Sequence, residues 1–489
     1  MAQRMTRREV MRRLGLAGAA ALSLRGPRAD AAAAPAEPAR GGRPNIVIIL
    51  ADDLGWADVG YHGSEIKTPN IDRIAGEGLR LERFYACPIC SPTRAGLMTG
   101  RWPLRVGIMR AVIPPWRKYG LPPEEELLPE MLAKAGYERR GCFGKWHLGH
   151  CHRRFHPVEQ GFTHFYGCYN GAIDYFTHER EGELDWHRGH EPARESGYTT
   201  TLLAGAAARF IAECPADKPF FVYLPFNAPH TPLQAPKKYL DRYPRLQGRR
   251  KTFAAMVDCM DEGIGRVLAA LDEKGVADNT LVWFFSDNGG GIGASNKPLR
   301  GGKQTLFEGG IRVPAAVRWP AGGLTGGRKV SAVMGYIDVL PTLRRIVGAA
   351  RHAGKPLDGV DVHDALAGRA DPPERKWYSY WAQAGENNER LAVIAGAWKL
   401  VREGPPILAP RRPAGKAKGA KLFLFRINED PNERTNLAEK HPDVVNALLK
   451  DLRTFRALRK KDGLPPYGQG REGFEAPTDW TMPAGRSGA

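Results

Sequence analysis

The sequence predicts an α/β protein in which a mixed sheet is covered by helices on both faces and is followed by a smaller C-terminal subdomain of antiparallel strands and a helix. Short, nearly continuous apolar runs begin at Asn45, and NIVIIL, FFVYLPF and TLVWFF are the clearest of them. Such runs are typical of strands that are buried on both faces. Amphipathic stretches alternate with the runs, and this alternation indicates a parallel or mixed sheet flanked by helices.

Three stretches with apolar residues at helical spacing supply the expected helices. They cover residues 127–132, 202–211 and 257–271, and Gly136 is expected to end the first. No internal repeat is evident in the chain. The order of elements therefore favours one large sheet over a repeat architecture.

A charged, Pro-containing stretch at residues 370–376 marks the expected boundary between a larger domain, residues 44–375, and the C-terminal subdomain, residues 376–489. Beyond it, RLAVIAGAWKLV and KLFLF predict strands. Apolar residues on one face then predict a helix over residues 444–455. A chain of 489 residues exceeds what one hydrophobic core usually serves, which agrees with such a division.

Composition excludes two broad classes of protein. An apolar fraction of 42% and a mean hydropathy of -0.41 argue against both a polytopic membrane protein and a largely disordered chain. The 57 Gly and 39 Pro residues indicate many structured loops, where binding and catalytic sites are commonly built.

The first residues follow the pattern of a secretion signal. A basic start, an apolar stretch at residues 14–24 and small residues around Ala31 predict a signal peptide over residues 1–31, followed by an Ala/Pro/Gly-rich linker over residues 32–43. TRREVMR, with Arg7 and Arg8, resembles a twin-arginine signal. The apolar stretch is too short to span a bilayer, so we expect export to the periplasm or the extracellular space without stable membrane insertion.

The net charge of +19 includes +6 from residues 1–43 and leaves +13 for the remainder. This charge could serve nucleic acid, an anionic membrane or an acidic polymer as partner, and charge alone does not choose among them. No nucleic-acid-binding motif accompanies it, so nucleic acid is not an expected partner. The chain has seven Cys, an odd number for an exported protein, and their spacing matches no disulfide scaffold. We therefore expect no structural disulfide framework and a separate fate for at least one Cys.

Polar clusters follow the three clearest strands. NIVIIL leads into Asp52 and Asp53, TLVWFF leads into Asp287 and Asn288, and FFVYLPF leads into the segment that ends at His230. Ligands of open α/β sheets bind beyond the carboxyl ends of the strands. Three carboxylates and an amide oxygen would form a hard cage suited to Ca²⁺ or Mg²⁺. The alternative is that these residues only cap a turn and open a Gly-rich loop.

The segment PICSPTRAGLMTGR at residues 88–101 resembles the signature of the sulfatase family. DDLGW, GKWHLG, NAPH, SDNGG, GGK and DPNERTN also occur in the family's order, so the resemblance covers nearly all of the chain after the signal. It implies an alkaline-phosphatase-like fold and hydrolysis of a sulfate ester. It also implies that a formylglycine-generating enzyme oxidises Cys90 to formylglycine, an aldehyde whose hydrate is the nucleophile.

The resemblance also implies which residues bind a metal and which take part in catalysis. It implies a divalent metal, usually Ca²⁺ and less often Mg²⁺, held by Asp52, Asp53, Asp287 and Asn288 together with the modified Cys90. It further implies catalytic roles for Arg94, which steadies the hydrate, for Lys145 and Lys303, which hold sulfate oxygens, and for His147 and His230, which handle protons. A thiol would be a soft ligand for a hard cation, whereas a hydrated aldehyde offers oxygen.

One segment departs from the family pattern. In GYERRGCFGK, Arg139 stands where the family usually has Ser or Thr, and one residue is extra before Lys145. This departure puts in question the register of the local strand more than the role of Lys145.

Two other interpretations of these residues remain. Cys87 and Cys90 form a C-x-x-C that could be redox-active or half of a zinc site. A transition-metal site could form from a second group of residues, which comprises His147, His150, Cys151, His152 and His156.

Residues 161–190 suggest the substrate. Their wording, GFTHFYGCYNGAIDYFTHE, resembles the arylsulfatase B or N-acetylgalactosamine-4-sulfatase branch. Aromatic side chains suit sugar rings, so we expect a sulfated carbohydrate as substrate, although some of these aromatics are expected in the core. The alternatives are a phosphonate or phosphate ester hydrolase of the same superfamily and a sulfated-glycan-binding protein whose Cys90 is never modified. Nothing in the sequence predicts an oligomeric state.

Overall fold

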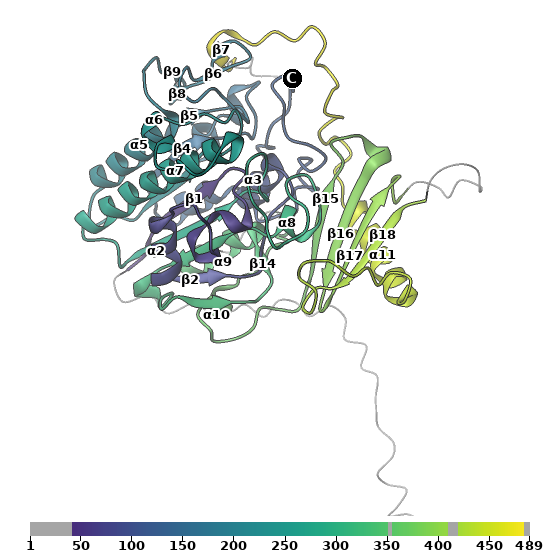
Figure 1. Cartoon of the computed structure of the whole chain (residues 1–489). Coiled ribbons are helices and arrows are strands. Elements are labelled where there is room, and N and C mark those ends of the chain that lie inside the picture. The colour runs from purple at the N-terminus through teal and green to yellow at the C-terminus, as the bar shows by residue number, and fades with distance from the viewer. Residues whose placement is uncertain (1–41, 351–354, 409–418, 484–489) are drawn as a thin grey trace, which may run out of the picture. The chain divides into compact units, whose positions relative to one another are not determined.

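The computed structural model describes residues 42–350, 355–408 and 419–483 (Figure 1). The predicted signal peptide and nearly all of the predicted linker lie outside the described residues, so both stay predictions. By their contacts the described residues fall within one compact unit.

The larger part of the chain is built on a ten-stranded mixed sheet, as predicted. Its strand order is β13-β2-β12-β11-β1-β10-β4-β5-β8-β9. Five neighbouring strands are parallel: β11 (Thr280–Ser286), β1 (Asn45–Ala51), β10 (Phe220–Pro225), β4 (Arg139–Lys145) and β5 (His164–Cys168). The short flanking strands are β12 (Ala315–Arg318), β2 (Leu79–Leu81), β13 (Arg328–Val330), β8 (His187–Arg188) and β9 (Glu191–Pro192). The three apolar runs identified in the sequence are the three central strands.

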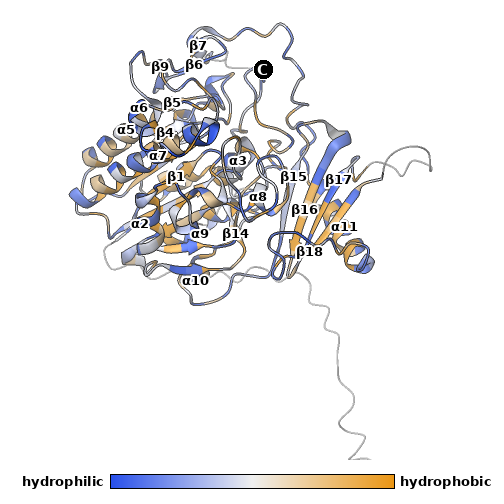
Figure 2. Ribbon diagram, viewed as in Figure 1, coloured by the Kyte–Doolittle hydropathy of each residue, from blue (hydrophilic) through white to orange (hydrophobic). Residues whose placement is uncertain are grey.

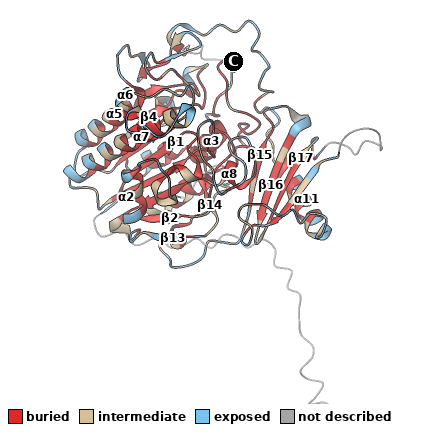
Figure 3. Ribbon diagram, viewed as in Figure 1, coloured by how far each residue is buried: buried red, intermediate tan, exposed pale blue. Residues whose placement is uncertain are grey.

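Helices cover both faces of this sheet. Alternate residues of β1 belong to different hydrophobic clusters: Ile46, Ile48 and Leu50 to one and Val47 and Ile49 to the other. Side chains of a strand alternate between its faces, so each cluster lies on one face. One cluster includes residues of α2 (Pro69–Glu77), α5 (Thr199–Glu213) and α7 (Gly248–Glu273), and the other includes residues of α3 (Cys90–Thr99), α4 (Leu128–Lys134) and α9 (Val339–Ile346). In Figure 3 the strands are buried and the outer sides of the helices are exposed.

The C-terminal part contains a four-stranded antiparallel sheet and one long helix, as predicted. The strands are β15 (Lys376–Trp381), β16 (Glu389–Ala395), β17 (Trp398–Gly404) and β18 (Lys421–Arg426), and the helix is α11 (Pro442–Ala457). RLAVIAGAWKLV forms two strands, because the chain turns at Gly396, whose φ is 56°. In Figure 2 the middle of β16 is hydrophobic, whereas β15 is not. Residues before and after the predicted boundary share one hydrophobic cluster, and the boundary itself stays a prediction.

Several short elements complete the described chain. They are β3 (Phe84–Tyr85), β14 (Met334–Gly335), β6 (Glu179–Arg180), β7 (Glu183–Leu184), α6 (Lys237–Leu240), α8 (Glu308–Ile311), α10 (His363–Leu366), η1 (Trp56–Asp58), η2 (Gly60–His62), η3 (Arg153–Phe155), η4 (Val158–Gln160), η5 (Pro320–Gly322), η6 (Tyr336–Asp338), η7 (Glu386–Asn388) and η8 (Thr478–Trp480). Among the described residues, no helix has both the length and the apolar character that crossing a membrane requires.

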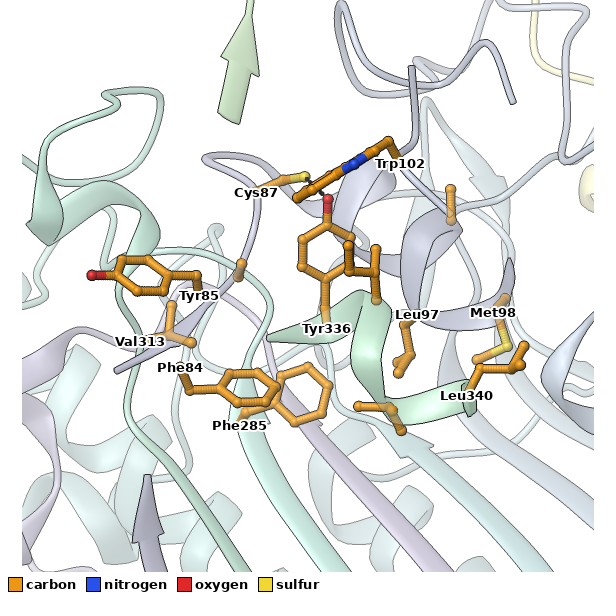
Figure 4. Packing of buried hydrophobic residues seen from close by; sticks show 14 of the residues in the cluster. Phe84, Tyr85, Cys87, Leu97, Met98, Trp102, Phe285, Val313, Tyr336 and Leu340 are labelled. Carbon is orange, nitrogen blue, oxygen red and sulfur yellow. Dashed lines mark hydrogen bonds between the residues drawn. The ribbon is translucent and has the colours of Figure 1, made fainter. Parts of the chain in front are cut away.

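All seven cysteines are free thiols. Cys87 packs in the core beside α3, where its thiol donates a hydrogen bond to the hydroxyl of Tyr336 at 3.1 Å (Figure 4). Burial raises the pKa of the Cys87 thiol to about 12. A neutral, packed thiol is a poor redox group, so the structure argues against the C-x-x-C interpretation.

Candidate active site

The four predicted metal ligands meet at one edge of the sheet. Strands β1 and β11 are parallel neighbours, and Ala51 lies opposite Ser286, so the residues that follow each strand lie side by side. The backbone N–H of Asp53 lies 3.4 Å from Oδ1 of Asp287, and the side-chain amide of Asn288 donates to Oδ1 of Asp53 at 2.8 Å. All four side chains are buried. The topology of the sheet therefore assembles three carboxylates and one amide in one place.

Cys90 joins this group from the first position of α3. Its Sγ and carboxylate oxygens of Asp52 and Asp287 all lie within 4.8 Å of one another. Burial raises the pKa of the Cys90 thiol, although the positive charges of Lys145 and Lys303 act in the opposite direction. The unmodified side chain is therefore a neutral thiol at neutral pH.

Arg94 lies one helical turn after Cys90 and contacts the same carboxylates. Its Nε and Nη2 donate to Oδ2 of Asp287 at 3.0 and 2.8 Å, and its Nη1 donates to the backbone oxygen of Lys145 at 2.6 Å. Nη2 also lies 3.6 Å from Oδ2 of Asp52. Burial disfavours the charged guanidinium, but the two carboxylates outweigh burial and raise the pKa of Arg94.

Two lysines supply further positive charge. Nζ of Lys145 forms an ion pair with Asp52, and Nζ of Lys303 lies 2.7 Å from Oδ1 of Asp53. Burial alone would raise the pKa of Asp53, but the charge of Lys303, together with the hydrogen bonds from Asn288 and Lys303, outweighs burial and holds that pKa below the usual range. Buried charges of one sign are tolerated only when they are paired, and these cations pair with the carboxylates.

The remaining oxygens fit a hard cation. Oδ1 of Asp52 and Oδ1 of Asn288 are buried and have no hydrogen-bond partner among the described residues. Burial, followed by repulsion from Asp52, raises the pKa of Asp287 to about 6. Unpartnered buried acceptors and crowded carboxylates are relieved when a divalent cation binds, and oxygen donors suit Ca²⁺ and Mg²⁺.

Two histidines lie beside the cage. Nε2 of His147 lies 3.1 Å from the carbonyl oxygen of Ile113, which can only accept, so Nε2 carries the proton and Nδ1 has no partner among the described residues. Nδ1 of His230 lies 2.7 Å from the carbonyl oxygen of Thr231, and its Nε2 is 3.7 Å from Oδ2 of Asp53. Burial lowers the pKa of both rings, that of His230 to about 3, and Lys303 adds to the effect on His230.

A cavity of about 450 Å³ opens above these groups. Its walls include four of the predicted catalytic residues, Cys90, His147, His230 and Lys303. The other lining residues are Ile89, Val112, Ile113, Pro114, Pro115, Gly171, Ala172, Arg180, Thr231, Pro232, Gln304, Gln383 and Tyr467. A volume of this size accommodates a small-molecule ligand.

The sequence did not point to four polar residues of this wall, which are Arg180, Gln304, Gln383 and Tyr467. Gln304 follows Lys303 directly, so its position could have been inferred from the GGK segment. Arg180 directly follows the stretch GFTHFYGCYNGAIDYFTHE, whereas Gln383 and Tyr467 come from distant segments that carry no recognisable motif.

The prediction that aromatic side chains of residues 161–190 form a platform for a sugar ring is wrong. Of the residues that suggested it, Phe165, Tyr166, Tyr169, Tyr175, Trp186 and His187 are buried, and Phe176 is 45% exposed. None of them is among the described residues that line the cavity. Residues 161–190 contribute Gly171, Ala172 and Arg180 to the wall instead.

The alternative transition-metal site is not assembled. Nε2 of His150 faces the carbonyl oxygen of Pro115 at 2.8 Å, and Nε2 of His156 faces that of Gly189 at 2.8 Å. Within the described ranges, the ligand groups close enough to share an ion are Asp52 with Cys90 and Asp287, and Asp52 with Asp53 and His230. His152 and Cys151 therefore have no ligand group to join.

The departure at Arg139 leaves the sheet intact. Arg139 is the first residue of β4 and pairs with Phe220 of β10. Its guanidinium lies 4.9 Å from the ring centroid of Phe210, a cation–π contact at the start of the strand. The strand then runs to Lys145, which reaches the edge where Asp52 lies.

Comparison with known proteins decides the family. A family model described as Sulfatase matches residues 44–349, more than half of the chain. The chain belongs to the sulfatase family. This sulfatase is 33% identical to arylsulfatase J of Mus musculus over 87% of this chain and 77% of that protein, and 32% identical to N-acetylgalactosamine-6-sulfatase of Homo sapiens over 83% and 84%. The arylsulfatase B branch suggested by residues 161–190 stays a prediction.

Solved structures agree with this assignment. The sulfatase resembles the crystal structure of Ps i-CgsB with a TM-score of 0.78 and 30% identity, over 88% of this chain and 96% of that one. It also resembles the phosphonate monoester hydrolase of Agrobacterium radiobacter with a TM-score of 0.61 and 21% identity, over 85% and 96%. The second likeness shows a shared fold only. The alkaline-phosphatase-like α/β fold expected from the sequence is thereby confirmed.

Proposed function

We propose that this sulfatase hydrolyses sulfate esters on carbohydrates, with Cys90, once oxidised to formylglycine by a formylglycine-generating enzyme, as the nucleophile. The observation that carries the proposal is the position of Cys90, which lies against Asp52 and Asp287 and also faces the cavity. Two relatives support a carbohydrate substrate: one is named N-acetylgalactosamine-6-sulfatase, and Ps i-CgsB has been solved in complex with k-i-k-neocarrahexaose.

The carboxylate cage would hold Ca²⁺, with Mg²⁺ as the less favoured ion. Its ligands would be Asp52, Asp53, Asp287 and Asn288, together with the modified side chain at position 90. When bound, such a cation would withdraw charge from the sulfate oxygens and favour the ionised form of a neighbouring hydroxyl. Arg94 holds Asp287 in place and steadies the nucleophile above it.

Lysines and histidines would complete the chemistry. Lys145 and Lys303 would hold sulfate oxygens and meet the charge that develops on them in the transition state. The hydrate at position 90 has two hydroxyl groups, one to attack sulfur and one to release sulfate afterwards. His147, whose Nδ1 is free to accept, would take the proton from the second hydroxyl.

His230 would donate a proton to the leaving alcohol oxygen. Burial and the charge of Lys303 lower the pKa of His230 and favour a neutral ring, and its Nδ1 faces the carbonyl oxygen of Thr231. A bound sulfate ester brings negative charge next to Nε2, and a neighbouring negative charge raises the pKa of an imidazole. The substrate itself would thus help to protonate the general acid.

Mass spectrometry of the peptide that contains Cys90 is the first experiment. Protein produced with a formylglycine-generating enzyme should show conversion of the thiol to the aldehyde, and the protein should release sulfate from a sulfated sugar. The Cys90→Ala variant should not turn over the substrate, and undiminished turnover by that variant would refute the proposal. An unmodified thiol together with tight glycan binding would favour the alternative of a glycan-binding protein.

The phosphoester alternative calls for a matched comparison. A metal and two lysines can hold either tetrahedral anion, and the fold is shared with a phosphonate monoester hydrolase. Sulfate and phosphate esters of one phenol should be compared at equal concentration. We expect a higher kcat/KM for the sulfate ester, and the reverse order would favour the alternative.

We also propose that the protein is exported through the twin-arginine pathway to the periplasm or the extracellular space. The support is the sequence of residues 1–31 with its arginine pair. Replacing Arg7 and Arg8 together with Lys should leave the protein in the cytoplasmic fraction. Export that is unaffected by the double replacement would contradict this route.

A further inference from the structure

Arg180 is a cation in the wall of the cavity that the chemistry proposed above does not use. It ends β6, and β6 pairs with β7 in a short hairpin. None of the described residues that line the cavity is Asp or Glu. The other cationic lining residue, Lys303, is already paired with Asp53 at 2.7 Å. Arg180 therefore gives the cavity wall a positive charge that no carboxylate among the described lining residues offsets.

The present partners of Arg180 are weak. Its Nη2 lies 3.1 Å from a carboxylate oxygen of Glu181, whose side chain is 42% exposed. Ion pairs of this exposed kind contribute about 0–1 kcal/mol. Its Nε is buried and has no hydrogen-bond partner among the described residues. An anion in the cavity could replace Glu181 at small cost and supply the acceptor that the guanidinium lacks.

The backbone at Arg180 is held in place by the C-terminal strap, which we define as residues 464–483. The strap runs from the C-terminal sheet to the β6–β7 hairpin (Figure 1). The indole N–H of Trp480, a fully buried side chain, donates to the backbone oxygen of Arg180 at 2.9 Å. The backbone N–H of Asp479 donates to a carboxylate oxygen of Glu183 at 3.0 Å. The strap thus clamps both strands of the hairpin.

The same strap also contributes to the cavity wall. Tyr467 lines the cavity, and its backbone oxygen accepts a hydrogen bond from the indole of Trp116 at 2.8 Å. The side chain of Arg117 donates to the backbone oxygen of Pro466 at 2.7 Å. Anchors at both ends keep Arg180 and Tyr467 in the same wall before any ligand arrives. A preorganised group loses less conformational entropy when it binds.

We infer that Arg180 forms a subsite for a second anionic group of the substrate, in addition to the sulfate that is hydrolysed. This inference rests on the proposed function and narrows the substrate class to carbohydrates that carry a further sulfate or a carboxylate. Both groups present oxygen acceptors that a guanidinium binds through paired N–H groups. The net charge of +13 beyond residues 1–43 also favours a polyanionic substrate.

Steady-state kinetics of Arg180→Gln on three sugars test the subsite. One sugar carries a single sulfate, the second carries that sulfate and another sulfate, and the third carries that sulfate and a carboxylate. Loss of a charge-assisted hydrogen bond should lower kcat/KM for a doubly charged sugar by about 10- to 100-fold, mainly through a higher KM. The loss for the singly sulfated sugar should be at least several-fold smaller. Comparing the second and third sugars shows which anion the subsite prefers.

Arg188→Gln is the matched control. Arg188 lies in β8, a strand of the ten-stranded sheet, its side chain is 61% exposed, and it is not among the lining residues. The Arg188→Gln variant loses the same charge as Arg180→Gln. It should change none of the three kcat/KM values by more than about twofold, because exposed charges interact weakly with a ligand at a distance. An equal loss on all three sugars in Arg180→Gln, or an equal selective loss in Arg188→Gln, would overturn the inference.

A binding measurement separates this inference from the proposed function. If the wild-type protein turned over none of the sugars, the proposed function would fail and the subsite would still be testable. Calorimetric titration with the disulfated and the carboxylated sugar should then give a Kd about 10-fold or more weaker in Arg180→Gln than in wild type. Equal Kd values for both sugars in the two proteins would refute the subsite.

Discussion

Replacing Arg94 with Gln tests how the buried carboxylates of the site are tolerated. Arg94 is fully buried and donates to Asp287 at 3.0 and 2.8 Å and to the backbone oxygen of Lys145 at 2.6 Å. Lys145 and Lys303 pair with the other two carboxylates, Asp52 and Asp53. Removing Arg94 therefore leaves Asp287 without the cation that pairs with it directly, although the charge of Lys145 still acts on it from further away.

The expected loss in the free energy of unfolding follows from breaking a buried ion pair. Removing one partner of such a pair costs about 3–5 kcal/mol. With an unfolding entropy of about 2.1 cal/mol/K per residue over 489 residues, this corresponds to a fall in Tm of about 3–5 °C. Arg94→Lys keeps the charge but loses the forked geometry and should cost less, about 1–3 kcal/mol. Its Tm should therefore lie between those of wild type and Arg94→Gln.

Thermal melts with a chelator and with added Ca²⁺ provide the assay. Without a cation, the order of Tm should be wild type, Arg94→Lys, Arg94→Gln. A bound cation supplies positive charge beside Asp287, so added Ca²⁺ should narrow the gap between wild type and Arg94→Gln. A Tm of Arg94→Gln within about 1 °C of wild type in chelator would refute the counter-charge argument. A gap that Ca²⁺ leaves unchanged would refute the proposed metal site.

Three further predictions concern positions away from the cage. Burial raises the pKa of Asp261 to about 6, so the folded protein takes up this proton at a higher pH than the unfolded chain does. The contribution of Asp261 to stability should therefore fall as pH rises from about 4 to about 6. Thermal melts across this pH range should show that the Asp261→Asn variant lacks this fall. Nζ of Lys399 lies 2.8 Å from a carboxylate oxygen of Glu308 and 2.8 Å from one of Glu433 in the core. Urea titrations should show that Lys399→Met lowers the free energy of unfolding by about 3–5 kcal/mol. A loss below about 1 kcal/mol would contradict the role of Lys399 as the counter-charge of the two carboxylates. Trp480→Ala should release the C-terminal strap, and hydrogen exchange of the backbone amides of residues 179–184 should then be faster than in wild type; unchanged protection would show that the strap does not hold the hairpin.

The centre of the fold was predictable because its strands are buried on both faces. Every residue of β1, β10 and β11 is buried, so each strand is a continuous apolar run in the sequence. Strands β8, β9 and β13 have only two or three residues, too few to show a pattern against surrounding loops. Their pairing depends on long-range contacts, which local sequence does not encode.

Aromatic content misled the sequence interpretation of residues 161–190. An aromatic ring between strands can pack in the core or face a ligand, and its neighbours in sequence do not distinguish the two cases. The rings of Tyr169 and His187 stack at 4.0 Å, and those of Tyr166 and Trp186 meet edge to face at 4.9 Å. These rings hold the segment together, while the small residues Gly171 and Ala172 reach the cavity.

The two halves of the site are encoded in different ways, and this difference has a functional consequence. The carboxylate cage follows the ends of adjacent parallel strands, so each of its residues is next to an apolar run and can be recognised locally. The cavity wall combines Arg180 with Gln383 and Tyr467, which lie more than two hundred residues further along the chain and reach the site through the C-terminal sheet and strap. Changes in the strap can therefore alter which sugar fits while the cage stays intact. In this protein, substitutions at Tyr467 should change KM for carbohydrate substrates more than kcat, because Tyr467 lines the cavity and its recorded hydrogen bond and ring contact are both with Trp116.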